Sequence, residues 1–203
     1  MCLSMPSQYE RKDYLYRKAK SEGLRSRANF KLQELDKKFK LIKANSKVLD
    51  LGAWPGSWLQ YILEKIGPNG RAVGIDLQHI DDFNDKRVKI LTGDVADVGL
   101  INEAQSFAGG SFDLIVSDMS PKLSGIREAD QARAAALSEL ALATAEKCLL
   151  AGGSFICKTF KGKDSEEFYK KIKNKFENLH RSELQSSRKS SNEYYIIGLG
   201  MRK

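Results

Sequence analysis

The chain has 203 residues and 41% hydrophobic residues, which suffices for one domain with a buried core and excludes a disordered chain. No apolar run approaches the roughly 20 residues that cross a membrane, and the first residues lack the apolar core of a signal peptide, so we expect a cytoplasmic protein. The net charge is +8, with +8 in residues 1–47, −6 in residues 48–157 and +6 in residues 158–203, so the two ends suit a polyanion and the middle suits a cationic small molecule.

The first 45 residues are predicted to form a basic helical extension, with Leu32, Leu35 and Phe39 on one helix face. Aromatic and basic side chains alternate along it. They are Tyr9, Tyr14, Tyr16 and Phe30, interleaved with Arg11, Lys12, Arg17, Lys18, Lys20, Arg25, Arg27 and Lys31. Because basic groups bind phosphates and aromatic faces stack on bases, this segment is predicted to contact single-stranded or looped RNA. The alternative is a helix face that is merely solvated.

Residues 46–203 alternate between strand and helix patterns. Strands are predicted over 47–51, 71–76, 87–92, 112–118 and 152–160, and helices over 57–66, 96–107 and 129–150. Phe168, Ile172, Phe176 and Leu179 are spaced as one face of a further helix, and final strands are expected near 182–187 and 194–201. The pattern predicts an α/β fold with a seven-stranded, mostly parallel sheet and helices on both faces. The last two strands are too close for a helical crossover, so one is expected to be antiparallel.

Charged residues end five successive strands: Asp50, Asp76, Asp94, Asp118 and Lys158. In an open parallel sheet, ligands bind beyond these carboxyl ends. The first strand also leads into a loop with Gly52 and Gly56, which allow a tight turn and close approach to a ligand. Asp76 is placed to accept hydrogen bonds from a ribose diol. The Gly-x-Gly-x-x-Gly spacing of nicotinamide enzymes is absent, which argues against a dehydrogenase.

Three cysteines, Cys2, Cys148 and Cys157, show no paired spacing, and His79 and His180 stand alone. This pattern argues against a disulfide framework and against a metal site. We therefore expect no metal, and we interpret all five as ordinary core or surface residues.

Five segments resemble one family over nearly the whole chain. They are residues 26–32, 50–58, 117–121, 158–160 and 190–195. The chain resembles the FtsJ/RrmJ family of S-adenosylmethionine-dependent RNA ribose 2′-O-methyltransferases, which implies a Rossmann-like class I methyltransferase fold. The family's Lys-Asp-Lys-Glu tetrad matches Lys31, Asp118, Lys158 and Glu193, here called the tetrad. Its cofactor positions match Gly56, Trp58, Asp76, Asp94 and Asp118, with Gly52 in the same loop. Trp54 and Ser57 depart from the family, which usually has a small residue and a glycine there.

The resemblance implies S-adenosyl-L-methionine as cofactor and a direct displacement that needs no metal. Asp76 would hold the ribose hydroxyls, Asp94 the adenine amino group, and Lys158 would accept the proton of the acceptor hydroxyl. Because lysine is protonated at neutral pH, a basic role requires burial and a second cation, Lys31, to favour its neutral form. Asp118 would orient Lys158 and Glu193 would hold the lysines. Whether Lys158 accepts the proton or only orients the hydroxyl stays open, as does a pair of structural salt bridges.

The family resemblance at this compact length implies the bacterial or organellar ribosomal branch, which acts on a uridine in the A-loop of large-subunit rRNA. We therefore expect an rRNA methyltransferase that acts as a monomer on rRNA, free or within the large subunit or its precursor, without a membrane partner. The alternatives are methylation of tRNA or of an mRNA cap, and a non-catalytic RNA-binding assembly factor. The intact tetrad argues against the last.

Overall fold

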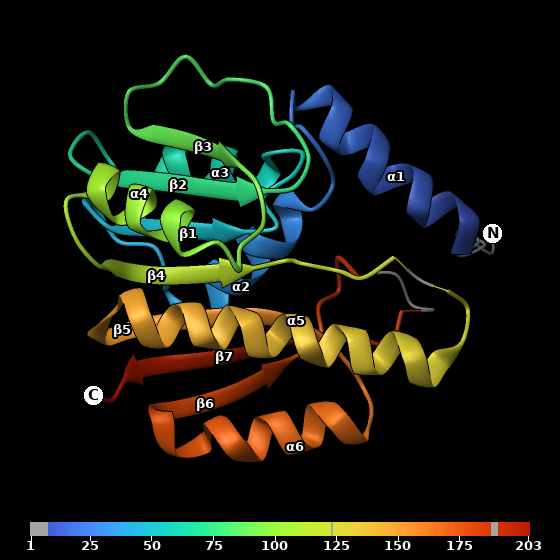
Figure 1. Cartoon of the computed structure of the whole chain (residues 1–203). Helices are drawn as coiled ribbons and strands as arrows, with labels where there is room; N and C mark the ends of the chain where they lie inside the picture. The colour runs from blue at the N-terminus through green and yellow to red at the C-terminus, as the bar shows by residue number, and fades with distance from the viewer. Residues whose placement is uncertain (1–7, 123, 188–190) are drawn as a thin grey trace.

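A computed structural model describes residues 8–122, 124–187 and 191–203, with side chains from residue 14 onward within these ranges. Figure 1 shows a central sheet with helices packed on both faces, and none of the described helices is long and apolar enough to span a membrane. The helices are α1 (Gln8–Ser21), α2 (Asn29–Phe39), α3 (Ser57–Lys65), α4 (Val98–Ala108), α5 (Arg127–Cys148), α6 (Lys163–Ile172) and the short 3-10 helix η1 (Lys173–Lys175). The strands are β1 (Lys47–Leu51), β2 (Arg71–Asp76), β3 (Val88–Thr92), β4 (Phe112–Ser117), β5 (Leu149–Phe160), β6 (Phe176–Ser182) and β7 (Glu193–Met201).

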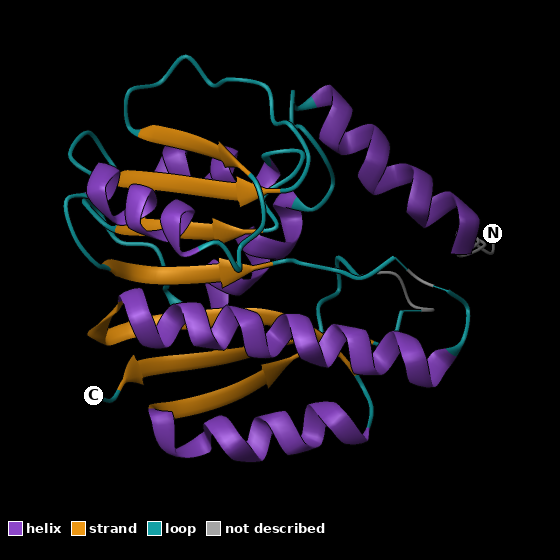
Figure 2. Cartoon of the chain, viewed as in Figure 1, coloured by secondary structure: helices purple, strands orange, loops and turns teal. Residues whose placement is uncertain are grey.

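The sheet has seven strands in the order β3-β2-β1-β4-β5-β7-β6 (Figure 2). The five strands from β3 to β5 pair in parallel, while β7 pairs antiparallel with both β5 and β6. The predicted mixed sheet with one antiparallel strand is therefore confirmed. The antiparallel register sets Lys158 opposite Tyr195 and Phe160 opposite Glu193, so β7 begins at the edge where the parallel strands end.

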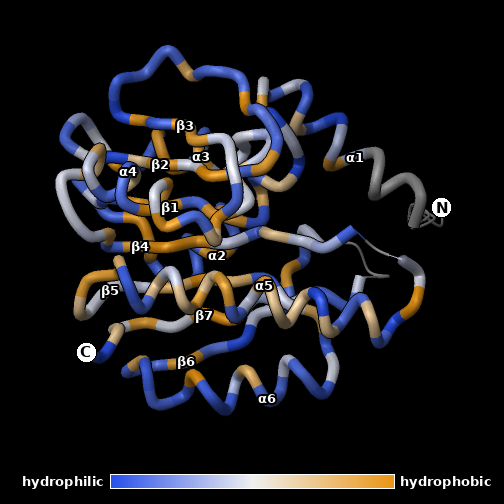
Figure 3. Tube along the Cα trace, viewed as in Figure 1, coloured by the Kyte–Doolittle hydropathy of each residue, from blue (hydrophilic) through white to orange (hydrophobic). Residues whose placement is uncertain are grey.

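Two hydrophobic clusters fill the two faces of the sheet. On one face, α4, α5 and α6 contribute Ile101, Ala141 and Phe168, and on the other, α2 and α3 contribute Leu35 and Ile62. Figure 3 shows the hydrophobic residues concentrated in the strands, whereas the described part of α1 is mostly hydrophilic. Thus α2 is one of the helices that cover the sheet, and α1 extends beyond it (Figure 1). The division at residue 45 into an extension and a domain stays a prediction.

The region after α6 differs from the expectation. Phe176 and Leu179 lie in β6 and not on a helix, and residues 183–187 follow β6 and do not form a strand. The physical reason is packing, because Phe176 is buried and its ring stacks on Phe155 of β5 with centroids 5.9 Å apart. Burial in the sheet therefore outweighs the helical spacing that links Phe176 to Phe168 and Ile172.

The fourth helix begins later than predicted. α4 starts at Val98 and not at residue 96, because the Asp97 carboxylate accepts a hydrogen bond of 2.7 Å from the Gly99 backbone N–H and so caps the helix. The other strands and helices match the predicted positions within a few residues.

Candidate active site

The loop after β1 requires both of its predicted glycines. Gly52 has φ +76°, and a Cβ on it would lie 2.6 Å from the Met119 side chain. Gly56 has φ +96°, and a Cβ there would lie 2.8 Å from the Arg25 guanidinium and 2.9 Å from the Phe83 ring. Any side chain would therefore strain the backbone and clash, so these two positions hold the loop close to the carboxyl edge of the sheet.

Asp76 ends β2 and fixes the same loop. Its Oδ2 accepts a 2.9 Å hydrogen bond from the Trp54 backbone N–H, and its Oδ1 accepts one of 2.8 Å from the Gln78 N–H. Each carboxylate oxygen keeps a lone pair for a further donor. Asp94, beyond β3, is exposed, and its Oδ1 accepts from the Ala96 N–H. These two of the three predicted cofactor-binding carboxylates thus lie at the edge where β2 and β3 end.

Asp50 is a site residue that the sequence places at a strand end without indicating its role. It is 1% exposed, and neither carboxylate oxygen has a hydrogen-bond partner within the described part of the chain. Burial first, and then the charges of Asp118 and Asp76, raise the pKa of this carboxyl well above its usual value. A buried acceptor without a donor is costly, so the position invites a donor or a cation from outside the chain.

The tetrad forms two lysine–carboxylate pairs at the carboxyl edge. In the first pair, Lys158 Nζ lies 3.0 Å from Asp118 Oδ1 and donates a 2.6 Å hydrogen bond to the Asp118 backbone carbonyl. The Tyr195 hydroxyl donates to the same Oδ1 at 2.7 Å. Tyr195 is fully buried and contacts the site from β7, although the sequence alone indicates no role for it. Asp118 is therefore held by donors from β5 and β7.

In the second pair, Lys31 Nζ of α2 lies 2.6 Å from Glu193 Oε1, at the first residue of β7. Both side chains are largely buried, with exposed fractions of 10% and 13%. The Lys31 ammonium also lies over the Tyr195 ring, 5.7 Å from its centroid. Tyr195 thus touches both pairs, and residues from α2, β5, β7 and the end of β4 meet in one place.

Electrostatics favour ionised carboxylates in both pairs. Burial alone would raise the pKa of Asp118, but the charges of Lys158 and Lys31 outweigh it, and the pKa is lowered. The pKa of Glu193 is lowered in the same way, because Lys31 and a hydrogen bond from Ser187 outweigh burial. Both carboxylates of the tetrad therefore favour the ionised form, although each is largely buried.

The structure adds contacts and exposures for three residues of the loop region that the sequence does not indicate. Trp58 is buried, and its indole N–H donates a 2.8 Å hydrogen bond to the Ala28 carbonyl, so it ties α3 to the segment before α2. Its contact with a cofactor stays a prediction. Ser57 is buried and donates a 2.7 Å hydrogen bond to the Ser26 hydroxyl, which gives this departure from the family a local structural role. Trp54 is 51% exposed.

Some of the predicted RNA-contacting side chains are exposed, whereas others bond other parts of the chain. Tyr14 and Tyr16 of α1 are largely exposed, at 62% and 60%. Arg25 instead bonds the carbonyls of Pro55, Asp81 and Asp82, so it fastens the chain to the loops after β1 and β2. The side chains of Tyr9, Arg11 and Lys12 lie outside the described residues.

Arg27 and Phe30 also contact other residues of the chain. Arg27 donates to the Ser186 carbonyl at 2.7 Å, and Lys18 lies over the Phe30 ring. The proposed contact with RNA therefore falls on α1 rather than on the segment between α1 and α2.

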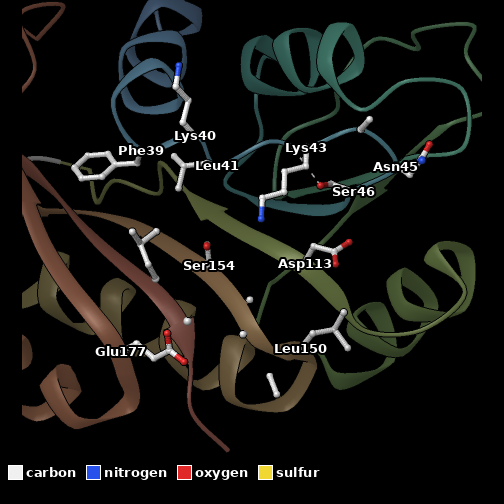
Figure 4. Close-up of a pocket in the computed structure, with 16 residues that line it drawn as sticks. Phe39, Lys40, Leu41, Lys43, Asn45, Ser46, Asp113, Leu150, Ser154 and Glu177 are labelled. Atoms are coloured by element: carbon white, nitrogen blue, oxygen red, sulfur yellow. Dashed lines mark hydrogen bonds between the residues drawn. The ribbon is translucent and has the colours of Figure 1, made fainter.

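A groove of about 500 Å³ lies at the opposite edge of the sheet (Figure 4). It is lined by the segment between α2 and β1, the starts of β4, β5 and β6, and the end of β7, and it includes Lys43, Asp113, Ser154 and Glu177. These positions are at the amino ends of the parallel strands, so the groove is separate from the tetrad.

The sequence matches the family model of FtsJ-like methyltransferases over residues 24–201. It is 42% identical over 195 residues to "Ribosomal RNA large subunit methyltransferase E" of Syntrophobacter fumaroxidans, covering 96% of this chain and 98% of that protein. A protein of the same name from Methanobrevibacter smithii is 38% identical, with 96% and 93% covered.

Solved structures show the same fold. One described as a ribosomal RNA methyltransferase from Plasmodium falciparum superimposes with a TM-score of 0.76 at 27% identity, over 87% of this chain and 98% of that chain. Aeropyrum pernix fibrillarin, solved with S-adenosyl-L-methionine, gives a TM-score of 0.54 at 13% identity, over 77% and 67%. With the tetrad assembled at the carboxyl edge and the family model spanning most of its length, the chain belongs to the FtsJ-like methyltransferase family.

Proposed function

We propose that this protein transfers the methyl group of S-adenosyl-L-methionine to a ribose 2′-hydroxyl of large-subunit rRNA. The observation that carries the proposal is the convergence of Lys31, Asp118, Lys158 and Glu193 on one edge of the sheet, beside the glycine loop. Relatives named as large-subunit rRNA methyltransferases, which align with nearly the whole chain, support the RNA substrate.

The residues at the carboxyl edge fit this cofactor. The unpartnered Asp50 carboxylate suits the ammonium group of the methionine portion, and Asp76 keeps lone pairs for the ribose diol. Asp94, Asp118, Trp58 and the Gly52–Gly56 loop complete the proposed set. The bound cofactor supplies a methyl group already activated by its positively charged sulfur.

The acceptor side of the reaction depends on Lys158. Two positions on its nitrogen are taken by the carbonyl and the carboxylate of Asp118, which leaves a third direction open. When Lys158 is neutral and its two N–H groups make these contacts, its lone pair points along the third direction, where it can accept the hydroxyl proton. Asp118 thereby orients the nitrogen, while Glu193 holds Lys31 in place beside it.

The finer proposal is that the target is a uridine of the A-loop, within the large ribosomal subunit or its precursor, and that the enzyme acts as a monomer in the cytoplasm. The resemblance to the FtsJ/RrmJ family and the compact length support this target. The exposed Tyr14 and Tyr16 on the hydrophilic α1 support contact with unstacked bases next to the site.

The test is methyl transfer from labelled cofactor to three purified RNAs: large-subunit rRNA, assembled subunits and tRNA. Mapping of 2′-O-methyl groups should show one modified position in the large-subunit rRNA or subunit samples. Modification of tRNA alone would overturn the rRNA substrate, and no transfer to any RNA by a folded protein that binds the cofactor would overturn the enzymatic function.

A further inference from the structure

The loop between β6 and β7 supplies a hydroxyl to the second lysine–carboxylate pair. Ser187 Oγ donates a 2.6 Å hydrogen bond to Glu193 Oε1, the same oxygen that lies 2.6 Å from Lys31 Nζ. The first pair has the same construction, because the Tyr195 hydroxyl and Lys158 both contact Asp118 Oδ1. Each carboxylate of the tetrad is therefore held by one lysine and one hydroxyl.

The position of Ser187 is fixed from α2. The Glu34 carboxylate accepts three hydrogen bonds from the loop, at 2.9 Å from Gln185 N, 3.1 Å from Ser186 N and 3.0 Å from Ser186 Oγ. Arg27 holds the Ser186 carbonyl, and the Ser187 N–H donates to the Leu184 carbonyl.

Glu34 lies one helical turn after Lys31 on the same helix. Helix α2 therefore carries Lys31 and, through Glu34, also anchors the loop that contains Ser187. Ser187 in turn holds Glu193, which is the ion-pair partner of Lys31. These hydrogen bonds give the Ser187 hydroxyl a defined position, which a freely moving serine would not have.

We propose that Ser187 is a positioning residue for methyl transfer, which fixes the Glu193 carboxylate and through it the Lys31 ammonium. This inference rests on the proposed function. Ser187 touches no reacting group, and its effect passes through Glu193. Without it, Glu193 keeps its ion pair with Lys31 but loses the second donor that fixes the orientation of the carboxylate.

The hydrogen bond from Ser187 to Glu193 should affect the pKa of the Glu193 carboxyl, which can be measured. Glu193 faces Lys31 from α2, Asp118 from the end of β4 and Ser187 from the loop. The serine hydroxyl favours the ionised carboxylate and lowers its pKa, so removal of the hydroxyl raises that pKa. The rise of activity with pH on the acidic side should then move to higher pH.

The experiment compares Ser187→Ala and Ser187→Thr with wild type. Ser187→Ala should reduce kcat about 10-fold, with little change in KM for RNA or in cofactor affinity, because a hydrogen bond to a charged group is lost. Carbon-detected NMR of the glutamate carboxylates should show Glu193 titrating at higher pH. Ser187→Thr, which keeps the hydroxyl, should restore both.

Ser191→Ala is the matched control, since its hydroxyl accepts from the Glu193 backbone N–H, whereas the Ser187 hydroxyl donates to the carboxylate. It should leave the Glu193 titration at its wild-type position. An unchanged titration and kcat in folded Ser187→Ala would overturn the positioning role while wild type still methylates RNA. If wild type itself transfers no methyl group, the proposed function fails, and the NMR titration alone then decides whether Ser187 holds Glu193.

Discussion

Lys158 is the residue on which the proposed chemistry depends most directly. Its side chain is 8% exposed and Asp118 contacts it twice, so its nitrogen has a fixed direction. We expect Lys158→Ala to reduce methyl transfer by roughly 100- to 10,000-fold, the usual cost of losing a general base. Single-turnover kinetics with saturating cofactor would measure it.

The control for this substitution is Lys161→Ala, three residues later, where the lysine is half-exposed and pairs with Glu183. That variant should keep wild-type turnover. Near-normal turnover in Lys158→Ala would remove Lys158 from the reaction, and a loss of cofactor affinity would point to a binding role instead.

Asp76 should determine cofactor affinity. Each charge-assisted hydrogen bond to the ribose diol contributes about 1.5–3 kcal/mol, so we expect Asp76→Ala to weaken binding by about 10-fold or more. Because Asp76 also holds the Trp54 and Gln78 N–H groups, part of the loss will come from the loop. Titration calorimetry with S-adenosyl-L-methionine would measure the change.

Asp82→Ala offers a matched loss of one charge from the loop after β2, because the Asp82 carboxylate bonds a backbone N–H and has no role in the proposed cofactor site. Equal cofactor affinities for wild type and a folded Asp76→Ala variant would show that Asp76 does not bind the cofactor and only ends the strand.

At the level of single residues, the sequence predicts only part of the site. Asp76, Asp94, Asp118 and Lys158 could be found because the ends of parallel strands share one edge, and the family resemblance adds Lys31 and Glu193. Ser187 and Tyr195 could not be found in this way, since their roles depend on which oxygen each hydroxyl meets. Asp50 was visible at a strand end, but only the structure shows that its carboxylate has no donor among the described residues.

Among the helices, α1 is mostly hydrophilic in its described part and extends beyond the sheet, so packing against the core does not explain its role. Replacement of Arg11, Lys12, Arg17 and Lys18 by Ala should weaken RNA binding and leave cofactor affinity unchanged. Affinity falls as salt rises, so a plot of log affinity against log salt has a negative slope. For each phosphate that the variant no longer neutralises, this slope should become less steep by roughly 0.7 to 0.9. Salt titrations on one rRNA fragment would measure the slope for both proteins.

Helix α6 and the segment after it provide the control, with four lysines that can be replaced for the same change in charge. They are Lys163, Lys170, Lys171 and Lys173. Two of them pair with carboxylates, Lys163 with Glu167 and Lys171 with Glu139, which reduces their attraction for phosphate. If this variant lost RNA affinity and the α1 variant did not, RNA would be bound by the α6 face.

The elements were predictable where local pattern and tertiary burial agree. Strands β1, β2 and β4 are largely apolar runs, and they are buried in the centre of the sheet, where such runs belong. At α6 and β6 the two disagree. The spacing of Phe168, Ile172, Phe176 and Leu179 suits a helix, yet Phe176 reaches the core only as the first residue of an edge strand.

At the scale of the whole molecule, acidic pH should lower the free energy of unfolding. The side-chain hydrogen bond from Arg87 lowers the pKa of Asp85 from 3.8 to about 2, and Arg87 also bonds the carbonyls of Leu63 and Gly67 at the end of α3. Because the folded pKa is the lower one, this stabilisation is present above about pH 4 and is lost as the pH falls through 2.

We therefore expect Asp85→Asn to lower the free energy of unfolding by about 1 kcal/mol at about pH 7, after allowance for screening by solvent. The difference from wild type should shrink progressively as the pH falls from about 4 to about 2. Urea denaturation at a series of pH values would measure it. A difference that stays constant with pH would show that the effect is not electrostatic.

The buried carboxylate of Asp50 also bears on how quickly the enzyme can begin a second cycle. Methyl transfer removes the charge from the sulfur of the cofactor but leaves its ammonium group unchanged. An ion pair with Asp50 would then stabilise the spent cofactor as much as the fresh one, and such uniform binding contributes affinity without lowering the barrier. The residue that secures the methyl donor would thus slow departure of the by-product, which makes by-product release a candidate for the slow step of turnover.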